Sequence, residues 1–106
     1  MGGAPFLISC KLIYNGLGVA LKALSDTGAN SFAFIDFTFA AQLCRFLDLF
    51  THALDYSILI KKYDGKLGPF ITRYLLLYLT IDGRKLLNIP FLILLLSNQN
   101  VILGRK

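Results

Sequence analysis

The chain has 106 residues, a hydrophobic fraction of 56% and a net charge of +5, and its six acidic residues are all aspartates. This length fits a single domain over 1–106, and the apolar content excludes intrinsic disorder, which accompanies low hydrophobicity and high net charge. One histidine, His52, and two cysteines, Cys10 and Cys44, are too few for a multi-histidine metal centre. We therefore expect no metal site, two reduced buried thiols and a surface histidine.

The N-terminal segment has the pattern of a β-hairpin followed by a further strand. Asn15-Gly16 separates two apolar runs, 5–14 and 17–25, and this dipeptide is the strongest short signal for a hairpin. Residues 32–35 are again apolar and are predicted to be extended. We therefore expect three strands before the first helix.

Asp36 has the position of a helix N-cap, because an apolar-periodic segment over 37–49 follows it directly. Side chains at three- and four-residue spacings share one face of a helix. The core-facing stripe predicted by this spacing consists of Phe39, Leu43, Phe46 and Leu47.

The second half of the chain predicts further strands joined by tight turns, after a polar connection that contains His52. Glycine-containing turns are expected at 64–69 and at 82–83, and a polar loop at 97–100. The strands are expected at 57–63, 70–81, 86–95 and 101–104. The total of about seven short strands and one helix indicates a mainly β domain.

The distribution of charge and hydropathy bears on possible partners. The eleven Lys and Arg residues stand singly or in pairs, without an arginine-rich run or a stacking-aromatic motif, so no nucleic-acid partner is expected. The leucine-rich runs at 74–81 and 89–96 are far shorter than the ~20 apolar residues of a membrane helix. Because the N-terminus also lacks the pattern of a signal peptide, we expect an intracellular, cytoplasmic protein without membrane contact.

A chemically suggestive motif follows the second predicted strand. Asp26 is succeeded by Thr27, Gly28 and Ala29, in which the glycine permits a tight turn and the alanine leaves room beside the carboxylate. Two adjacent aspartates share a proton and have their pKa values driven apart, which supplies a base and an acid for amide hydrolysis. Since the motif occurs once, the second carboxylate must come from another copy in a two-fold dimer.

Several segments, in their order, resemble retropepsin-like aspartic proteases. Residues 23–30 (ALSDTGAN) resemble the active-site loop of that family, and 34–49 resemble its next strand and helix. Residues 64–68 (DGKLG) lie where the family has its glycine-containing flap, and 102–105 (ILGR) resemble its closing hydrophobic-hydrophobic-glycine element. The likeness covers about residues 5–106 and is nearest to proteases of Ty3/gypsy-type retrotransposon polyproteins, such as those of fungi.

The resemblance implies a retropepsin-like half-barrel with one or two short helices, functional as a two-fold homodimer. It implies an aspartic endopeptidase that cleaves extended polypeptides in retroelement polyprotein processing and needs no cofactor. In this family Asp26 of each subunit would activate water and protonate the substrate carbonyl. The implied supporting roles are loop bracing and substrate binding for Thr27, Gly28, Ala29 and Asn30, flap closure for Asp64, Gly65, Lys66, Leu67 and Gly68, and loop support and dimer contact for Ile102, Leu103, Gly104 and Arg105.

The chain departs from the family pattern in three places. Asn30 stands where the family often has an aspartate that pairs with the arginine matching Arg105, and Ser25 replaces a commonly apolar residue. The family also continues beyond position 106 through a short helix and a strand, so a C-terminally truncated domain is expected. The alternative interpretation is a catalytically inactive, retroelement-derived remnant that acts as a peptide-binding or self-association module.

Overall fold

The computed structural model describes residues 6–26, 33–61, 67–96 and 98–104. These ranges form seven strands and one helix, so the prediction of a mainly β domain is confirmed. The elements are β1 (Phe6–Tyr14), β2 (Leu17–Asp26), β3 (Ala33–Asp36), α1 (Phe37–Leu47), β4 (His52–Lys61), β5 (Leu67–Ile81), β6 (Arg84–Leu94) and β7 (Val101–Gly104).

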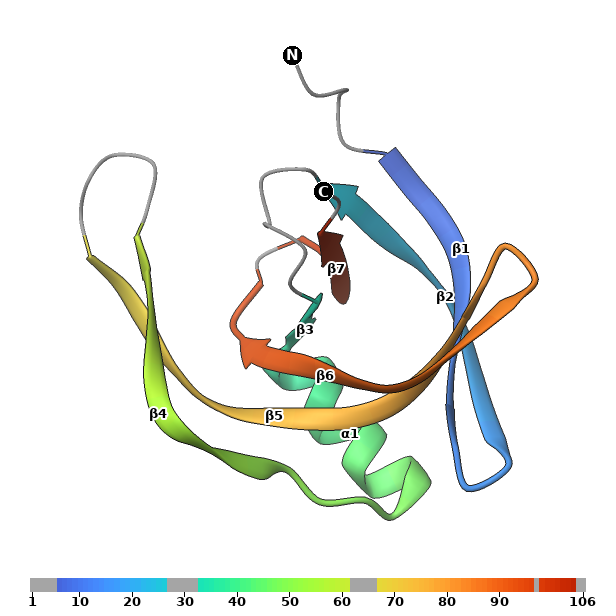
Figure 1. Cartoon of the computed structure of the whole chain (residues 1–106), viewed down its shortest axis with the longest axis horizontal. Helices are drawn as coiled ribbons and strands as arrows, with labels where there is room; N and C mark the ends of the chain where they lie inside the picture. The colour runs from blue at the N-terminus through green and yellow to red at the C-terminus, as the bar shows by residue number, and fades with distance from the viewer. Residues whose placement is uncertain (1–5, 27–32, 62–66, 97, 105–106) are drawn as a thin grey trace.

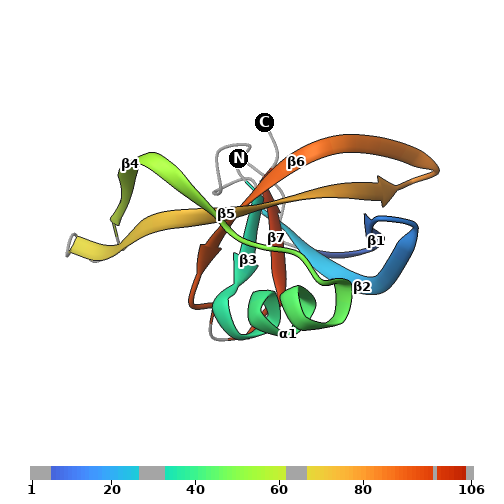
Figure 2. The same ribbon diagram turned by 90° about the horizontal axis from the view of Figure 1, so that it is seen from below.

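The strands form one sheet that closes on itself. Their order is β1-β2-β7-β3-β6-β5-β4, and an additional pairing of β1 with β5 closes six of them into a barrel, with β4 appended to β5 (Figure 1). The short strand β7 lies between β2 and β3, parallel to the first and antiparallel to the second. Figure 2 shows α1 on one side of the molecule, with β5 and β6 on the other.

Both predicted two-residue turns are confirmed. Asn15 and Gly16 have φ angles of 52° and 82°, and Asp82 and Gly83 have φ angles of 50° and 74°. Two successive residues with positive φ characterise the type I′ turn, whose twist matches that of the adjoining strands. In the first hairpin, this turn sets a continuous antiparallel register over the full length of β1.

Asp36 caps α1 as predicted, but the helix ends earlier than expected. The Asp36 carboxylate accepts hydrogen bonds from the backbone N–H groups of Thr38 and Phe39, both at 3.1 Å. The helix ends at Leu47 rather than at 49, because Asp48 adopts the left-handed conformation, with φ 53°. Such a residue ends the α-helical hydrogen-bonding pattern.

The prediction that Phe46 faces the core is wrong. Phe46 is 64% exposed, whereas Ala40, Leu43 and Leu47 are buried and Phe39 is half-buried. Phe46 lies about a quarter turn from the centre of the buried stripe, given 3.6 residues per turn. Because only a narrow face of α1 packs against β3 and β6, a side chain at that angle projects into solvent.

The strand boundaries in the second half differ from the predictions. β4 begins at His52 rather than at 57, so the expected polar connection is largely strand, and β5 begins at Leu67 rather than at 70. His52 is exposed, as predicted, and stacks on Tyr74 with ring centroids 5.3 Å apart. Arg73 donates hydrogen bonds to the hydroxyl and, at 2.9 Å, to the carbonyl of Thr51. These cross-strand contacts extend β4 through residues whose local sequence favours a loop.

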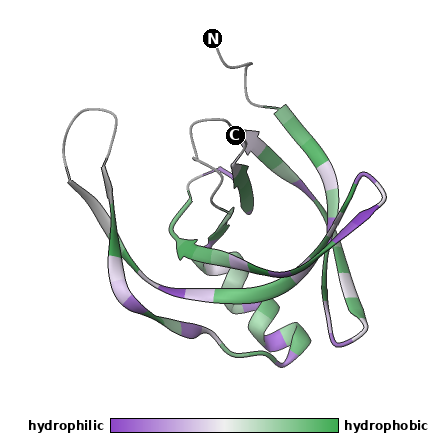
Figure 3. Cartoon of the chain, in the orientation of Figure 1, coloured by the Kyte–Doolittle hydropathy of each residue, from purple (hydrophilic) through white to green (hydrophobic). Residues whose placement is uncertain are grey.

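The core lies inside the barrel and beneath α1. The strands are largely hydrophobic along their length, while the β5–β6 turn is hydrophilic (Figure 3). Cys10 is buried, Cys44 is half-buried rather than buried, and both thiols are free. The largest fully buried side chains are Phe91, Leu12, Ile35, Ile71, Leu75, Leu77 and Val101.

Within the described ranges, no helix is both long and apolar enough to cross a membrane.

Candidate functional site

Asp26 is the last residue of β2, and its position is defined by the neighbouring strand. Its Cα partner in the parallel pairing of β2 with β7 is Gly104. The two motifs picked out at opposite ends of the chain, around Asp26 and around Gly104, are therefore adjacent in space. The loop residues Thr27, Gly28, Ala29 and Asn30 lie outside the described residues.

Strand β7 joins the two strands that enter and leave segment 27–32. Ile102 pairs with Leu24 of β2 on one side and with Phe34 of β3 on the other. Leu103 likewise lies between Ser25 and Ala33. A single short strand thus pairs with the strands on both sides of segment 27–32.

Strand β7 and its neighbour β3 are part of the barrel wall. Val101 and Ile35 are both fully buried, and β3 continues the sheet through a parallel pairing with β6. The end of β2 is therefore joined to the barrel through β7, which is paired along both of its edges.

The predicted flap is only partly described. Leu67 is the first residue of β5 and pairs with Lys61, and Gly68 follows it. The other predicted flap residues, Asp64, Gly65 and Lys66, lie outside the described residues. Arg105, near the C-terminus, also lies outside them. The last part of β4 and the start of β5 stand apart from the end of β2 in this structure (Figure 1). The structure therefore brings together Asp26 and 102–104 but does not bring Leu67 and Gly68 to them.

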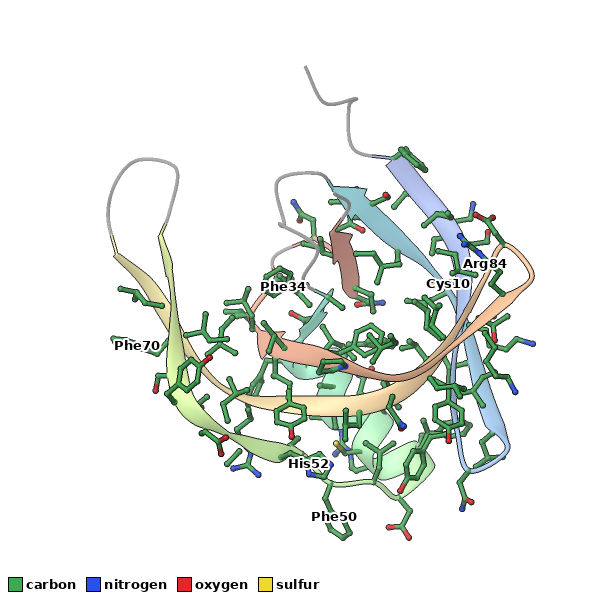
Figure 4. All side chains as sticks on the ribbon, in the orientation of Figure 1. Cys10, Phe34, Phe50, His52, Phe70 and Arg84 are labelled. Atoms are coloured by element: carbon green, nitrogen blue, oxygen red, sulfur yellow. The ribbon has the colours of Figure 1, made fainter. Side chains whose placement is uncertain are left out.

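Two apolar features adjoin the end of β2. A groove of about 430 Å³ is lined by Ser25, Leu103 and Gly104 together with Phe6, and Ser25 is 4% exposed. A second cluster contains the buried residues Phe34, Ile71 and Leu92 and packs against Ile102; Phe34 is labelled in Figure 4. Apolar side chains thus lie near the end of β2.

Asp36 has a connection that sequence reasoning missed. Besides capping α1, its carboxylate accepts a hydrogen bond at 2.9 Å from the backbone N–H of Leu96, and its own N–H donates to the Asn100 carbonyl at 2.8 Å. No local signal distinguishes an aspartate that only caps a helix from one that also binds a distant loop.

The described residues do not gather three or more His, Cys, Asp or Glu side chains in a geometry suited to a metal ion. Comparison of the chain with the models of known families, with curated proteins and with solved structures finds no match.

Proposed function

We propose that the chain is one subunit of a homodimeric, retropepsin-like aspartic endopeptidase with Asp26 as its catalytic residue. The observation that carries the proposal is the pairing of Asp26 with Gly104 in β7, which also pairs with β3. This arrangement supports an aspartate held firmly at a strand end, immediately before the Thr-Gly-Ala segment.

The proposed chemistry needs two such carboxylates. One ionised aspartate takes a proton from the attacking water, while the protonated partner donates to the carbonyl oxygen of the peptide. The chain contains one Asp-Thr-Gly sequence, so the second carboxylate comes from a second copy across a two-fold axis. Water is the nucleophile and the protein supplies both acid–base groups, so the proposed reaction uses no cofactor.

Rigid placement of the carboxylates matters because misplacement by about 1 Å can cost roughly 100-fold in rate. In the proposed enzyme, β7 restrains Asp26 through Gly104 and restrains the returning strand through Ile102 and Leu103. The roles assigned to 102–104 are therefore structural support for the loop, as the family resemblance implies.

The proposed substrate is an extended polypeptide, as in the processing of a retroelement polyprotein. Leu24 and Ile102 pair across β2 and β7 and are both half-buried, so they offer apolar surface beside the carboxylate. The tip at 64–68 is proposed to close over the substrate, bind it as an added strand and exclude water.

Peptide cleavage tests this function most directly. The wild-type chain should cleave a library of extended peptides at mildly acidic pH, a pepstatin-like inhibitor should block the cleavage, and Asp26→Asn should abolish it. Asp48→Asn is the matched control, because it also removes one carboxylate, at an exposed residue whose left-handed conformation, with φ 53°, suits asparagine. Equal cleavage by the wild type and Asp26→Asn would show that Asp26 is not catalytic.

Sedimentation distinguishes the proposal from the inactive-remnant alternative. The protease requires a dimer, and Asp26→Asn should sediment as the wild type does, because the substitution is nearly isosteric. A strict monomer cannot assemble two Asp26 carboxylates. A chain that lacks turnover at every pH but still binds peptides or self-associates would support the remnant.

A further inference from the structure

A groove of about 660 Å³ lies on the barrel wall, away from the residues that surround Asp26. Its lining comes from the β1–β2 turn, the α1–β4 connection and strands β1, β4, β5 and β6. This volume lies within the roughly 300–1,000 Å³ of typical ligand sites. The lining residues that carry the argument are Tyr14, Phe50, His52, Tyr78, Lys85 and Asn88.

Four aromatic side chains from separate segments meet in this groove. Tyr14 and Tyr78 are 37% and 38% exposed and Phe50 is 81% exposed, so all three present ring surface to solvent. His52 is also exposed and stacks on Tyr74, which restrains its ring. Figure 4 shows Phe50 and His52 together at the start of β4. Exposed rings around an open groove are suited to stacking against planar ligands.

The groove has positive charge and no acidic lining. Lys85 contributes directly, and the strand register places Lys11 of β1 and Lys85 of β6 on either side of Thr80 of β5. These two lysines are exposed and flank the same strand. Lys11 lies outside the lining, which thus combines aromatic faces with one lysine, Lys85, that would pair with an anionic ligand.

Asn88 adds a polar group at an irregular position. It has a φ of 53° and lies where the β5–β6 register shifts between the pairings of Leu77 and Leu79. A register shift of this kind redirects side chains and is common beside functional sites. A left-handed backbone at a residue other than glycine also costs free energy. An amide group can hydrogen-bond to the edge of a nucleobase.

The strands beneath the groove are paired in part. Ile13 of β1 pairs with Gly18 on one side and with Tyr78 on the other, and Leu76 of β5 pairs with Pro90 of β6. β4, which contributes His52 to the lining, is the edge strand of the sheet. The exposed rings and Lys85 favour a ligand recognised by stacking and charge.

We propose that this groove binds single-stranded nucleic acid, with bases stacked on Tyr78, Phe50 and Tyr14 and a phosphate against Lys85. This reverses the expectation from the sequence, which contains no stacking motif because the rings come from positions far apart along the chain. The proposal does not depend on the protease assignment, so either can fail without the other.

The test is the binding of a fluorescein-labelled, mixed-sequence single strand of about eight nucleotides, followed by anisotropy over a range of salt concentrations. Phe50→Ala and Tyr78→Ala should each weaken binding about tenfold. Phe50 is exposed enough for its removal to leave the fold intact, and Tyr56→Ala, at a 77% exposed tyrosine outside the groove, is the matched control.

Charge is tested by a second pair of variants. Lys85→Gln should reduce the slope of log affinity against log salt by about one, as expected for one lost phosphate contact. Arg45→Gln removes the same charge from exposed α1 surface and should leave the slope unchanged. The proposal is overturned if the single strand does not bind at low salt, if the control variants lose as much affinity, or if a duplex or a polyglutamate peptide competes equally well.

Discussion

The carboxylate of Asp36 accepts a hydrogen bond from the backbone N–H of Leu96, 60 residues later in the chain, at 2.9 Å. The same carboxylate caps α1, and the Asp36 N–H donates to the Asn100 carbonyl. The connection between β6 and β7 is thus bound to Asp36 near both of its ends. This restrains the start of β7, which then runs to Gly104 beside Asp26.

Replacement of Asp36 should lower stability through two separable effects. Asp36→Ala removes the helix cap and leaves the Leu96 N–H without its acceptor, so the free energy of unfolding should fall by about 2–4 kcal/mol. Asp36→Ser keeps a good capping hydroxyl but cannot reach both partners, so it should recover only part of the loss. Urea denaturation followed by circular dichroism measures both. Equal stability of the Ala and Ser variants would contradict a capping contribution.

The buried stripe of α1 predicts contrasting effects for two neighbouring positions. Leu43→Ala should lower the free energy of unfolding by about 2–4 kcal/mol, because Leu43 is 3% exposed and its removal leaves a cavity. Phe46→Ala, at a 64% exposed side chain, should change stability by no more than about 0.5 kcal/mol. Thermal and chemical unfolding would reveal the difference, and similar losses at both positions would mean that Phe46 is buried in solution.

The first hairpin offers a test of backbone strain within a few residues. Gly16 has a φ of 82°, so Gly16→Ala should cost about 1–2 kcal/mol, although its added Cβ would meet no atom. Gly18→Ala is the control, since the added Cβ meets the flexible Lys11 side chain at 3.0 Å and Ile13 at an ordinary contact distance of 3.7 Å. It should change stability by about 0.5 kcal/mol or less. Equilibrium unfolding compares the two, and a harmless Gly16→Ala would rule out the type I′ turn.

Burial raises the pKa of the Cys10 thiol, although a backbone hydrogen bond at Ala23 partly offsets this effect. Because the folded-state pKa lies above the unfolded value, the stabilising contribution is complete below the unfolded pKa and declines as pH rises through the folded pKa. The free energy of unfolding should therefore decrease above the ordinary thiol pKa. Cys10→Val cannot ionise, so its alkaline decrease should be shallower in parallel urea titrations; identical slopes would count against the linkage.

Local sequence patterns determined much of the secondary structure. Asn15-Gly16 and Asp82-Gly83 specify their turns because few other residue pairs adopt two successive positive φ angles. Asp36 marks the start of α1 because an aspartate oxygen can accept from the first free helix N–H groups. The Asp26 motif and the closing 102–104 element were also visible in the sequence, since each depends on neighbouring residues.

Only the tertiary structure decided which distant residues meet. The pairing of Asp26 with Gly104, the bond from Leu96 to Asp36 and the aromatic groove around Tyr78 all join segments far apart in the chain. Hydropathy and propensity describe each segment alone, whereas barrel closure is set by the pairing of whole strands. The sequence thus singled out Asp26 as a candidate, but only the tertiary structure placed β7 between β2 and β3, with Gly104 beside Asp26.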